Sequence, residues 1–188
     1  VYNSMTSRLL VDKIEGKTTS NTVQMPSGSV VQVVQNTPTS TTHITIIQSP
    51  PTMAEVSTTF RTTIVPKFAS SLLRLNFQCL IGGRNSSSIM GIKFFDITNS
   101  SNVGFSSLGT GSSRTFVNAS VRTKDHDAND RDHLNMTAYQ SANNTNSRTY
   151  TIQAYKESNG TMDFNMTGTD NSGCSYAPPV FTIEEIAQ

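Results

Sequence analysis

Residues 73–81 have the sequence Leu-Arg-Leu-Asn-Phe-Gln-Cys-Leu-Ile, and this stretch decides the fold class. Apolar side chains stand at 73, 75, 77, 79 and 81, whereas Arg74, Asn76 and Gln78 stand between them. Successive side chains of a β-strand point to opposite faces, so a period of two predicts a strand with one buried and one polar face. We therefore expect a core strand here.

Weaker strand patterns recur on both sides of this stretch. In the segment 55–65, alternate residues are expected to share one half-buried strand face: Val56, Thr58, Phe60, Thr62 and Ile64. The glycines at 82 and 83 begin a turn, which predicts a hairpin between the core strand and the segment 89–97. Further strands are expected at residues 30–34, 39–48, 115–122, 148–156, 161–166 and 180–186.

The composition also favours β structure. Ser, Thr, Asn and Gln make up 75 of the 188 residues, and the hydrophobic fraction is only 35%. Thr is a good strand former, and Ser, Asn and Gly serve turns, while the strong helix formers are sparse. No amphipathic segment of helix length is available to cover a parallel sheet. The sequence therefore predicts an all-β protein, an antiparallel β-sandwich of the jelly-roll kind.

Charge is scarce and balanced, which limits the classes of partner. The chain has 14 Lys and Arg against 13 Asp and Glu. Such a chain is not an electrostatic partner for a polyanion or an anionic membrane, so no nucleic-acid partner is expected. No run approaches the roughly 18 apolar residues of a membrane helix, so no membrane insertion is expected. Cys79 and Cys174 are expected to be free thiols, with a single bridge as the alternative in an oxidising compartment.

The first 28 residues differ from the rest and are expected to form an N-terminal arm, with the β domain covering residues 29–188. The arm contains a small apolar cluster of Leu9, Leu10, Val11 and Ile14. About ten residues are too few for a self-supporting helix in water, so an ordered arm would lie on another surface or on another copy of the chain. A frayed terminus is the alternative interpretation.

The most charged segment, residues 124–133, holds four Asp and two of the three His. It fails the calcium-loop pattern, because Asp130 stands where that loop has Gly and Met136 where it has Glu. His126 and His133 have a spacing that no common zinc motif predicts. We expect no metal and no cofactor, and interpret the segment as a solvated loop. Its candidates for an exposed binding loop are Lys124, Asp125, His126, Asp130 and His133.

Motifs for catalysis are missing from the sequence. The segment 109–113 lacks the Ser flanked by glycines of a nucleophile elbow, and there is no Gly-Lys-Ser/Thr phosphate loop. No catalytic residue is assigned, and the protein is not expected to be an enzyme. Four tyrosines could offer flat area and hydrogen bonds to a carbohydrate or protein, although a place in the core or on a strand face is the simpler role for each: Tyr139, Tyr150, Tyr155 and Tyr176.

Four segments together resemble the tail-fibre-like virion proteins of phages that infect marine bacteria and cyanobacteria. They are SRLLVDKIEGKTTSNTVQMPSGSVVQVVQ at 7–35, FRTTIVPKFASSLLRLNFQCLIGG at 60–83, TYTIQAYKESNGTMDFNM at 149–166 and FTIEEIAQ at 181–188. The stretch between about Ile97 and Ser147 has no counterpart in that pattern. The resemblance implies a homotrimeric protein of the virion surface, with a β domain that faces the environment and an arm, residues 1–28, that attaches to another virion protein of the tail or capsid.

Three functions follow as expectations. The first is a non-enzymatic tail-fibre or spike tip that binds a host receptor, either a surface polysaccharide or a protein. The second is a capsid decoration protein that stabilises the head, because the resembling fibres carry a long shaft whereas this chain passes from arm to domain in under thirty residues. The third is a small polysaccharide hydrolase, which would depend on Asp125, Asp130 or His133.

Overall fold

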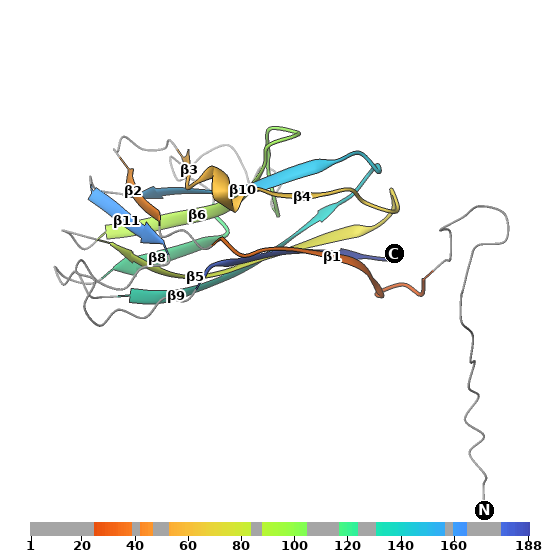
Figure 1. Cartoon of the computed structure of the whole chain (residues 1–188), viewed down its shortest axis with the longest axis horizontal. Helices are drawn as coiled ribbons and strands as arrows, with labels where there is room; N and C mark the ends of the chain where they lie inside the picture. The colour runs from red at the N-terminus through yellow and green to blue at the C-terminus, as the bar shows by residue number, and fades with distance from the viewer. Residues whose placement is uncertain are drawn as a thin grey trace, which may run out of the picture.

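The protein is an all-β sandwich of two antiparallel sheets (Figure 1). The computed structural model describes residues 25–38, 42–46, 53–83, 88–104, 117–123, 131–156, 160–164 and 178–188. Within these ranges the only helical segment is a single 3-10 turn, η1 (Thr58–Phe60). No helix of the described residues is long and apolar enough to cross a membrane. The predicted all-β class and antiparallel sandwich are thus confirmed.

The first sheet is organised around the long strand β5 (Leu72–Gly83). One edge of β5 pairs with β9 (Arg131–Ser141) along almost its whole length. The other edge pairs first with β12 (Val180–Ile186) and then with β11 (Gly160–Phe164). The outer strands β1 (Val30–Asn36) and β2 (Thr42–Ile46) pair with β12 and β11, respectively. Because β5 has partners on both edges, it is the central strand of this layer.

The second sheet is centred on β10 (Arg148–Lys156) and β6 (Ser88–Asp96), which pair with each other. The short strands β3 (Ala54–Glu55) and β4 (Thr62–Ile64) pair with the free edge of β10. On the far side, β7 (Ser101–Asn102) and β8 (Ala119–Thr123) pair with β6. Figure 1 shows β10, β6 and β4 in one layer and β1, β5 and β9 in the other.

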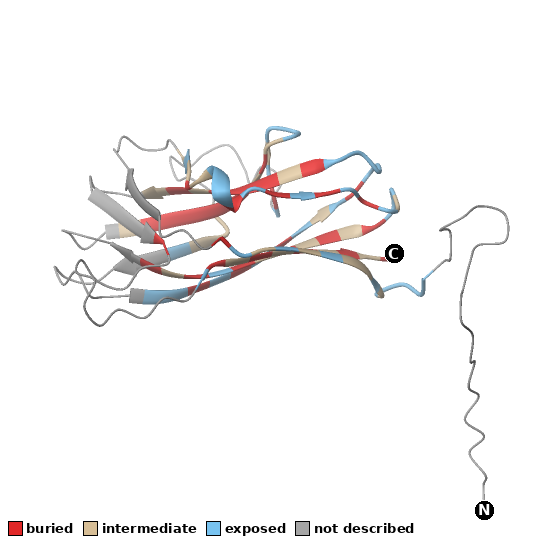
Figure 2. Ribbon diagram, viewed as in Figure 1, coloured by how far each residue is buried: buried red, intermediate tan, exposed pale blue. Residues whose placement is uncertain are grey.

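The core lies between the two layers and contains a group of aromatic rings. Phe77 of β5 lies 5.6 Å from Phe60 and 6.1 Å from Phe181, measured between ring centroids. Phe94 of β6 joins them at 5.5 Å from Phe181, so rings from both sheets meet. The predicted inner face of β5 is buried throughout: Leu73, Leu75, Phe77, Cys79 and Ile81. Figure 2 shows the buried residues along the strands of both layers, and alternation of side chains therefore explains how the core forms.

Cys79 is a free thiol on this inner face, and its burial raises its pKa. Desolvation disfavours the thiolate, which is the reactive form of cysteine. Cys174 lies outside the described residues.

The hairpin predicted between the core strand and the segment 89–97 is wrong. β5 belongs to the first sheet and β6 to the second, so the chain crosses from one layer to the other between them. Both edges of β5 are taken by strands from far along the chain, namely β9, β11 and β12. Local turn residues indicate where a strand ends, but they do not specify which layer receives the next one.

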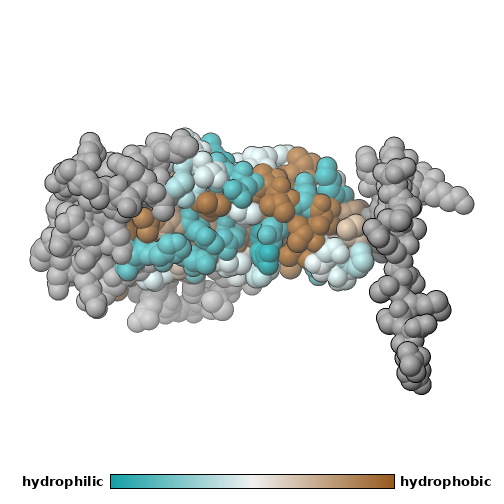
Figure 3. All heavy atoms as spheres, turned by 60° about the horizontal axis from the view of Figure 1, so that its bottom comes forward, coloured by the Kyte–Doolittle hydropathy of each residue, from teal (hydrophilic) through white to brown (hydrophobic). Residues whose placement is uncertain are grey.

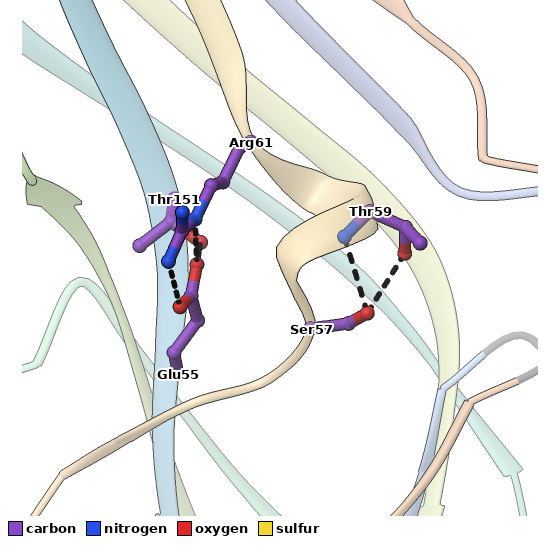
Figure 4. Close-up of polar contacts among 5 residues, drawn as sticks. All are labelled: Glu55, Ser57, Thr59, Arg61 and Thr151. Atoms are coloured by element: carbon purple, nitrogen blue, oxygen red, sulfur yellow. Dashed lines mark hydrogen bonds and ion pairs between the residues drawn. The ribbon is translucent and has the colours of Figure 1, made fainter.

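The continuous strand predicted for 55–65 is also wrong, because η1 interrupts it. Ser57 caps this turn, and its hydroxyl accepts a hydrogen bond from the backbone N–H of Thr59 at 3.2 Å. Glu55, on one side of η1, accepts hydrogen bonds from Arg61 Nε and Nη2 on the other side, each at 2.8 Å. It also accepts a hydrogen bond from Thr151 Oγ1 at 2.7 Å (Figure 4). Phe60 is turned into the core, while Thr58 is exposed rather than on the expected buried face.

The edge of the first sheet is joined to the second sheet by two amide side chains of β1. Gln32 Nε2 donates to the carbonyl oxygen of Val65 at 2.7 Å. Asn36 Nδ2 donates to the carbonyl oxygens of Thr59 at 2.9 Å and of Arg61 at 3.1 Å. An unpaired strand edge attracts further strands, and these contacts cover part of it.

The chain enters β1 through a tight turn. Ser29 N–H donates to the Pro26 carbonyl at 3.0 Å, and Gly28 adopts a φ of 87°, which glycine tolerates without strain. Gly28 N–H also donates to the Ala187 carbonyl at 2.8 Å, so the two ends of the described chain lie together.

Candidate binding face on the first sheet

The candidate site lies on the outer face of the first sheet, opposite the core. Strand pairing places residues of β1, β12, β5 and β9 in rows across this face. One row consists of Val33, Glu184, Arg74 and Tyr139. The next row consists of Gln35, Thr182, Asn76 and Thr137. Each side chain is therefore held by the register of a four-stranded sheet.

A shallow hollow of about 380 Å³ opens on these rows. Seven residues line it, all from the three strands β5, β9 and β12: Arg74, Asn76, Gln78, Thr137, Tyr139, Thr182 and Glu184. We call this hollow the groove. Figure 3, which brings this side of the molecule forward, shows hydrophilic residues gathered over the middle of the face and hydrophobic ones toward its right-hand end.

Charge in the groove is paired. Arg74 forms an ion pair with Glu184 through Nη2, and this carboxylate raises the pKa of the guanidinium further. The two residues are directly opposite each other on neighbouring strands, which is the favourable cross-strand arrangement for opposite charges. The groove thus offers a fixed donor group and a fixed acceptor group without a large net charge.

Amide and hydroxyl groups extend the groove along β5. Asn76 Nδ2 donates to Thr137 Oγ1 at 2.9 Å and to Asn135 Oδ1 at 3.3 Å, which fixes the orientation of the Asn76 amide. Tyr139 stands at the other end of the groove and keeps 49% of its surface exposed. An exposed aromatic ring beside oriented polar groups is typical of surfaces that bind polar ligands.

The lining of the groove consists of groups that can hold a polar ligand. Its members are an ion pair, amides, hydroxyls and one phenol, and His133 is not among them. Within the part of the chain that the structure describes, no three His, Cys, Asp or Glu side chains come together as a metal site would need. The lining can donate and accept hydrogen bonds and can stack against an apolar ligand face.

The structure places one of the five predicted loop candidates on this same face. His133 is exposed and pairs with Leu80 across β9 and β5, beyond Asn135. The expected solvated loop is wrong at this point, because β9 begins at Arg131 and His133 is a strand residue. The other four candidates, Lys124, Asp125, His126 and Asp130, lie outside the described residues. So do the arm residues Leu9, Leu10, Val11 and Ile14.

The described tyrosines lie in the core or on a strand face, the roles that the sequence favours. Tyr150 is fully buried in the core, and its burial raises its pKa to about 12. Tyr155 covers Gly91 of the second sheet. Tyr139 is the exposed one on a strand face, and Tyr176 lies outside the described residues.

Only part of the groove is predicted by the sequence. Arg74, Asn76 and Gln78 were expected on the polar face of their strand, and this is confirmed. Thr182 and Glu184 were not assigned to a site, although the alternation of FTIEEI places both on one face. Nothing local indicates that β12 and β9 flank β5, so the groove could not be assembled from the sequence.

A second polar site lies inside the sandwich and is structural. Glu185, fully buried on the inner face of β12, accepts hydrogen bonds from the backbone N–H groups of Lys67 at 2.8 Å and Phe68 at 2.9 Å. Ser71 Oγ donates at 2.7 Å and Gln32 Nε2 at 2.6 Å. Burial alone would raise the pKa of Glu185, but these four donors outweigh it and lower the pKa. The carboxylate therefore holds the loop after β4 against β1 and β12.

No protein-family model matches the chain, and no curated protein does so.

Proposed function

We propose that the chain is a non-enzymatic protein of the virion surface, which binds a saccharide of the host surface in the groove. The observation that carries the binding role is the groove itself, where Tyr139, the Arg74–Glu184 pair and oriented amides stand on one rigid face. The assignment to a phage virion is supported by the resemblance of the four sequence segments. The jelly-roll strand order and the homotrimer stay predictions.

The chemistry of the lining favours a neutral saccharide over an anionic ligand. Arg74 is already paired with Glu184, so an anion would have to compete with a carboxylate fixed beside it. A sugar hydroxyl both donates and accepts, so neighbouring hydroxyls could bond Glu184 and Arg74 at the same time. The apolar face of a sugar ring could lie against the Tyr139 ring.

The scaffold is suited to such recognition. β5 is bonded on both edges, and the inner faces of β5 and β12 are packed in the core, so the backbone that carries most of the groove is held in place. Sites built on strands hold their polar groups more precisely than sites built on loops. A preformed site loses less conformational entropy on binding.

The test is calorimetric titration of the full chain with a panel of neutral oligosaccharides from host surfaces. The variant Tyr139→Ala is expected to weaken binding about tenfold or more, and Gln78→Ala by a smaller factor. Gln153→Ala, an amide change on the second sheet, is the matched control and should leave the affinity unchanged. Equal affinities for Y139A and Q153A would contradict the proposal, as would hydrolysis of the oligosaccharide during titration.

A further inference from the structure

Strand β9 pairs with β5 along one edge only. The Ala142 N–H donates to the Ser71 carbonyl at 2.9 Å, and these two residues continue the register of β5 and β9. They are therefore a hydrogen-bonded pair, and such pairs alternate along an antiparallel ladder. Every second residue of β9 accordingly points its N–H and C=O away from β5: His133, Asn135, Thr137, Tyr139 and Ser141. Among the described strands, β5 is the only one that pairs with β9 (Figure 1).

One of these outward groups is already used. The Ser141 carbonyl accepts a hydrogen bond from Arg148 Nη1 at 3.1 Å. The other four residues present their N–H and C=O groups without a backbone partner in the part of the chain that the structure describes. We call His133, Asn135, Thr137 and Tyr139 the open edge.

The open edge lacks the protection that other strand edges of the molecule have. The edge of β1 is bonded through Gln32 and Asn36 to the backbone of residues 59–65. The outer strands β3, β4 and β7 are only two or three residues long. β9 has eleven residues paired in unbroken register, and residues 132–141 include neither Pro nor Lys. Long, regular edges of this kind accept a further strand.

We propose that β9 pairs antiparallel with β9 of a second copy of this chain, about a twofold axis at Met136. This axis sets His133 opposite Tyr139 of the second copy and Asn135 opposite its Thr137. Each of these pairs exchanges two backbone hydrogen bonds. All four residues of the open edge are then paired with one another, and Ser141, whose carbonyl is taken, is left out.

The distribution of charge favours a second copy as the occupant. From Leu134 to Ser141 the strand has no charged side chain, so the edge offers nothing that selects a charged segment of another protein. Antiparallel pairing sets Asp132 opposite the uncharged Gln140 of the second copy. Parallel pairing in register would set each Asp132 beside its own counterpart, and like charges facing each other are destabilising.

The pairing would extend the groove. Thr137 and Tyr139 line the groove from β9, and residues opposite each other in a sheet share a face. Asn135 and His133 of the second copy would therefore stand beside them on the outer face. A pair of this kind uses the same surface twice and closes as a dimer, so the proposal differs from the homotrimer that the sequence resemblance implies. It does not depend on the proposed saccharide.

The mass and the amide exchange of the unmodified full chain test the proposal together. Analytical ultracentrifugation from about 1 to 100 µM should show a monomer–dimer equilibrium. At the upper concentration, amides of Asn135, Thr137 and Tyr139 should exchange at least about tenfold more slowly than at the lower one. Amides of Met136 and Ala138, which bond to β5, should exchange equally at both. A monomer or a trimer throughout would overturn the proposal, as would exchange at the open edge that does not depend on concentration.

Charge variants test the register. Asn135→Lys with Thr137→Lys sets lysines directly opposite each other across the axis, so the dimer should weaken at least about hundredfold. Asn135→Glu with Thr137→Glu should do the same, and an equal mixture of the two variants should restore a dimer. Thr63→Lys, at an exposed threonine of β4, is the matched control and should leave dimerisation unchanged.

Circular dichroism shows whether each variant is folded. A dimer that persists in folded N135K/T137K would overturn the proposal, as would a mixture of the two folded variants that stays monomeric. If a variant fails to fold, the concentration dependence of amide exchange in the unmodified chain decides alone.

Discussion

Glu184 and Glu185 are adjacent on β12 yet serve opposite sides of the same sheet. Glu184 points outward and pairs with Arg74 in the groove, whereas Glu185 points inward and is fully buried under the loop that follows β4. The period of two in a strand separates them, so one carboxylate is available to a ligand and the other holds the fold. Variants of these neighbours should therefore have different consequences.

Glu185 should make the protein sensitive to acid. Its pKa is lower in the folded protein than in the unfolded chain, so its stabilising contribution is complete above about pH 4.3, the ordinary value for Glu. The contribution is lost as the pH falls through the lower pKa of the folded state. Glu185→Gln should cost about 1–3 kcal/mol at pH 7, because a neutral amide cannot accept from all four donors. Urea unfolding at pH 7 and pH 3 measures both effects.

Glu55 also contributes to the loss of stability in acid, because its bonds to Arg61 lower its pKa. Comparing the original protein with E185Q at pH 7 and pH 3 separates the contribution of Glu185 from that of Glu55. The original protein should lose more unfolding free energy between pH 7 and pH 3 than E185Q loses. An equal loss in both would show that Glu185 does not carry this pH dependence.

The neighbouring residues Phe77 and Gln78 test the assignment of the two faces of β5. Phe77 is fully buried against Phe60 and Phe181, so Phe77→Ala should destabilise the protein by about 3–5 kcal/mol. Gln78 is exposed in the groove, so Gln78→Ala should change stability by no more than about 0.5 kcal/mol. Chemical denaturation of both variants decides this, and similar losses would mean that the alternation is misassigned.

Gly91 should not tolerate a side chain. A Cβ atom there would collide with the ring of Tyr155 and approach Val117 Cγ1 to 2.6 Å. Gly91→Ala should therefore cost about 1–3 kcal/mol through overpacking. In the double variant Gly91→Ala, Tyr155→Ala the collision with the ring is removed. The double variant should therefore lose less stability than the sum of the losses in the two single variants. Strict additivity in thermal unfolding would contradict the contact.

Cys79 should be chemically inert in the folded protein. Its thiol is buried between the sheets and its raised pKa keeps it protonated at neutral pH. Alkylation with iodoacetamide at pH 8, mapped by peptide mass spectrometry, should leave Cys79 unmodified natively and label it in concentrated urea. Rapid native labelling of this residue would place it at the surface.

The sequence predicted those parts of the fold that depend on local alternation. β5 was found because Leu73, Leu75 and Phe77 alternate with polar residues over a long run. β9 has the same pattern at Leu134, Met136 and Ala138, yet no strand is predicted there, because the charged segment 124–133 overlaps its first residues and has the composition of a loop. A period of two is local information about a strand, and charged residues at the start of the strand do not remove it.

The pairing of strands and the full groove could not be predicted in this way. Gly82 and Gly83 signalled the end of β5, but the layer that receives β6 is decided by packing of the whole core. The groove joins Arg74 to Tyr139 and Glu184, residues far apart in the sequence that meet only through strand pairing. The alternation in β5 therefore predicts the polar face of that strand, but not which strands pair with β5.

The central claim is that the outer face of the first sheet binds a ligand. Titration of the isotope-labelled full chain with the tightest-binding neutral oligosaccharide, followed by amide and side-chain NMR, tests it most directly. Shifts should concentrate on Asn76, Thr137 and Tyr139, and the resonances of Gln153 on the second sheet should stay in place. Shifts centred on the second sheet, or no saturable shift with any host-surface oligosaccharide, would contradict the account.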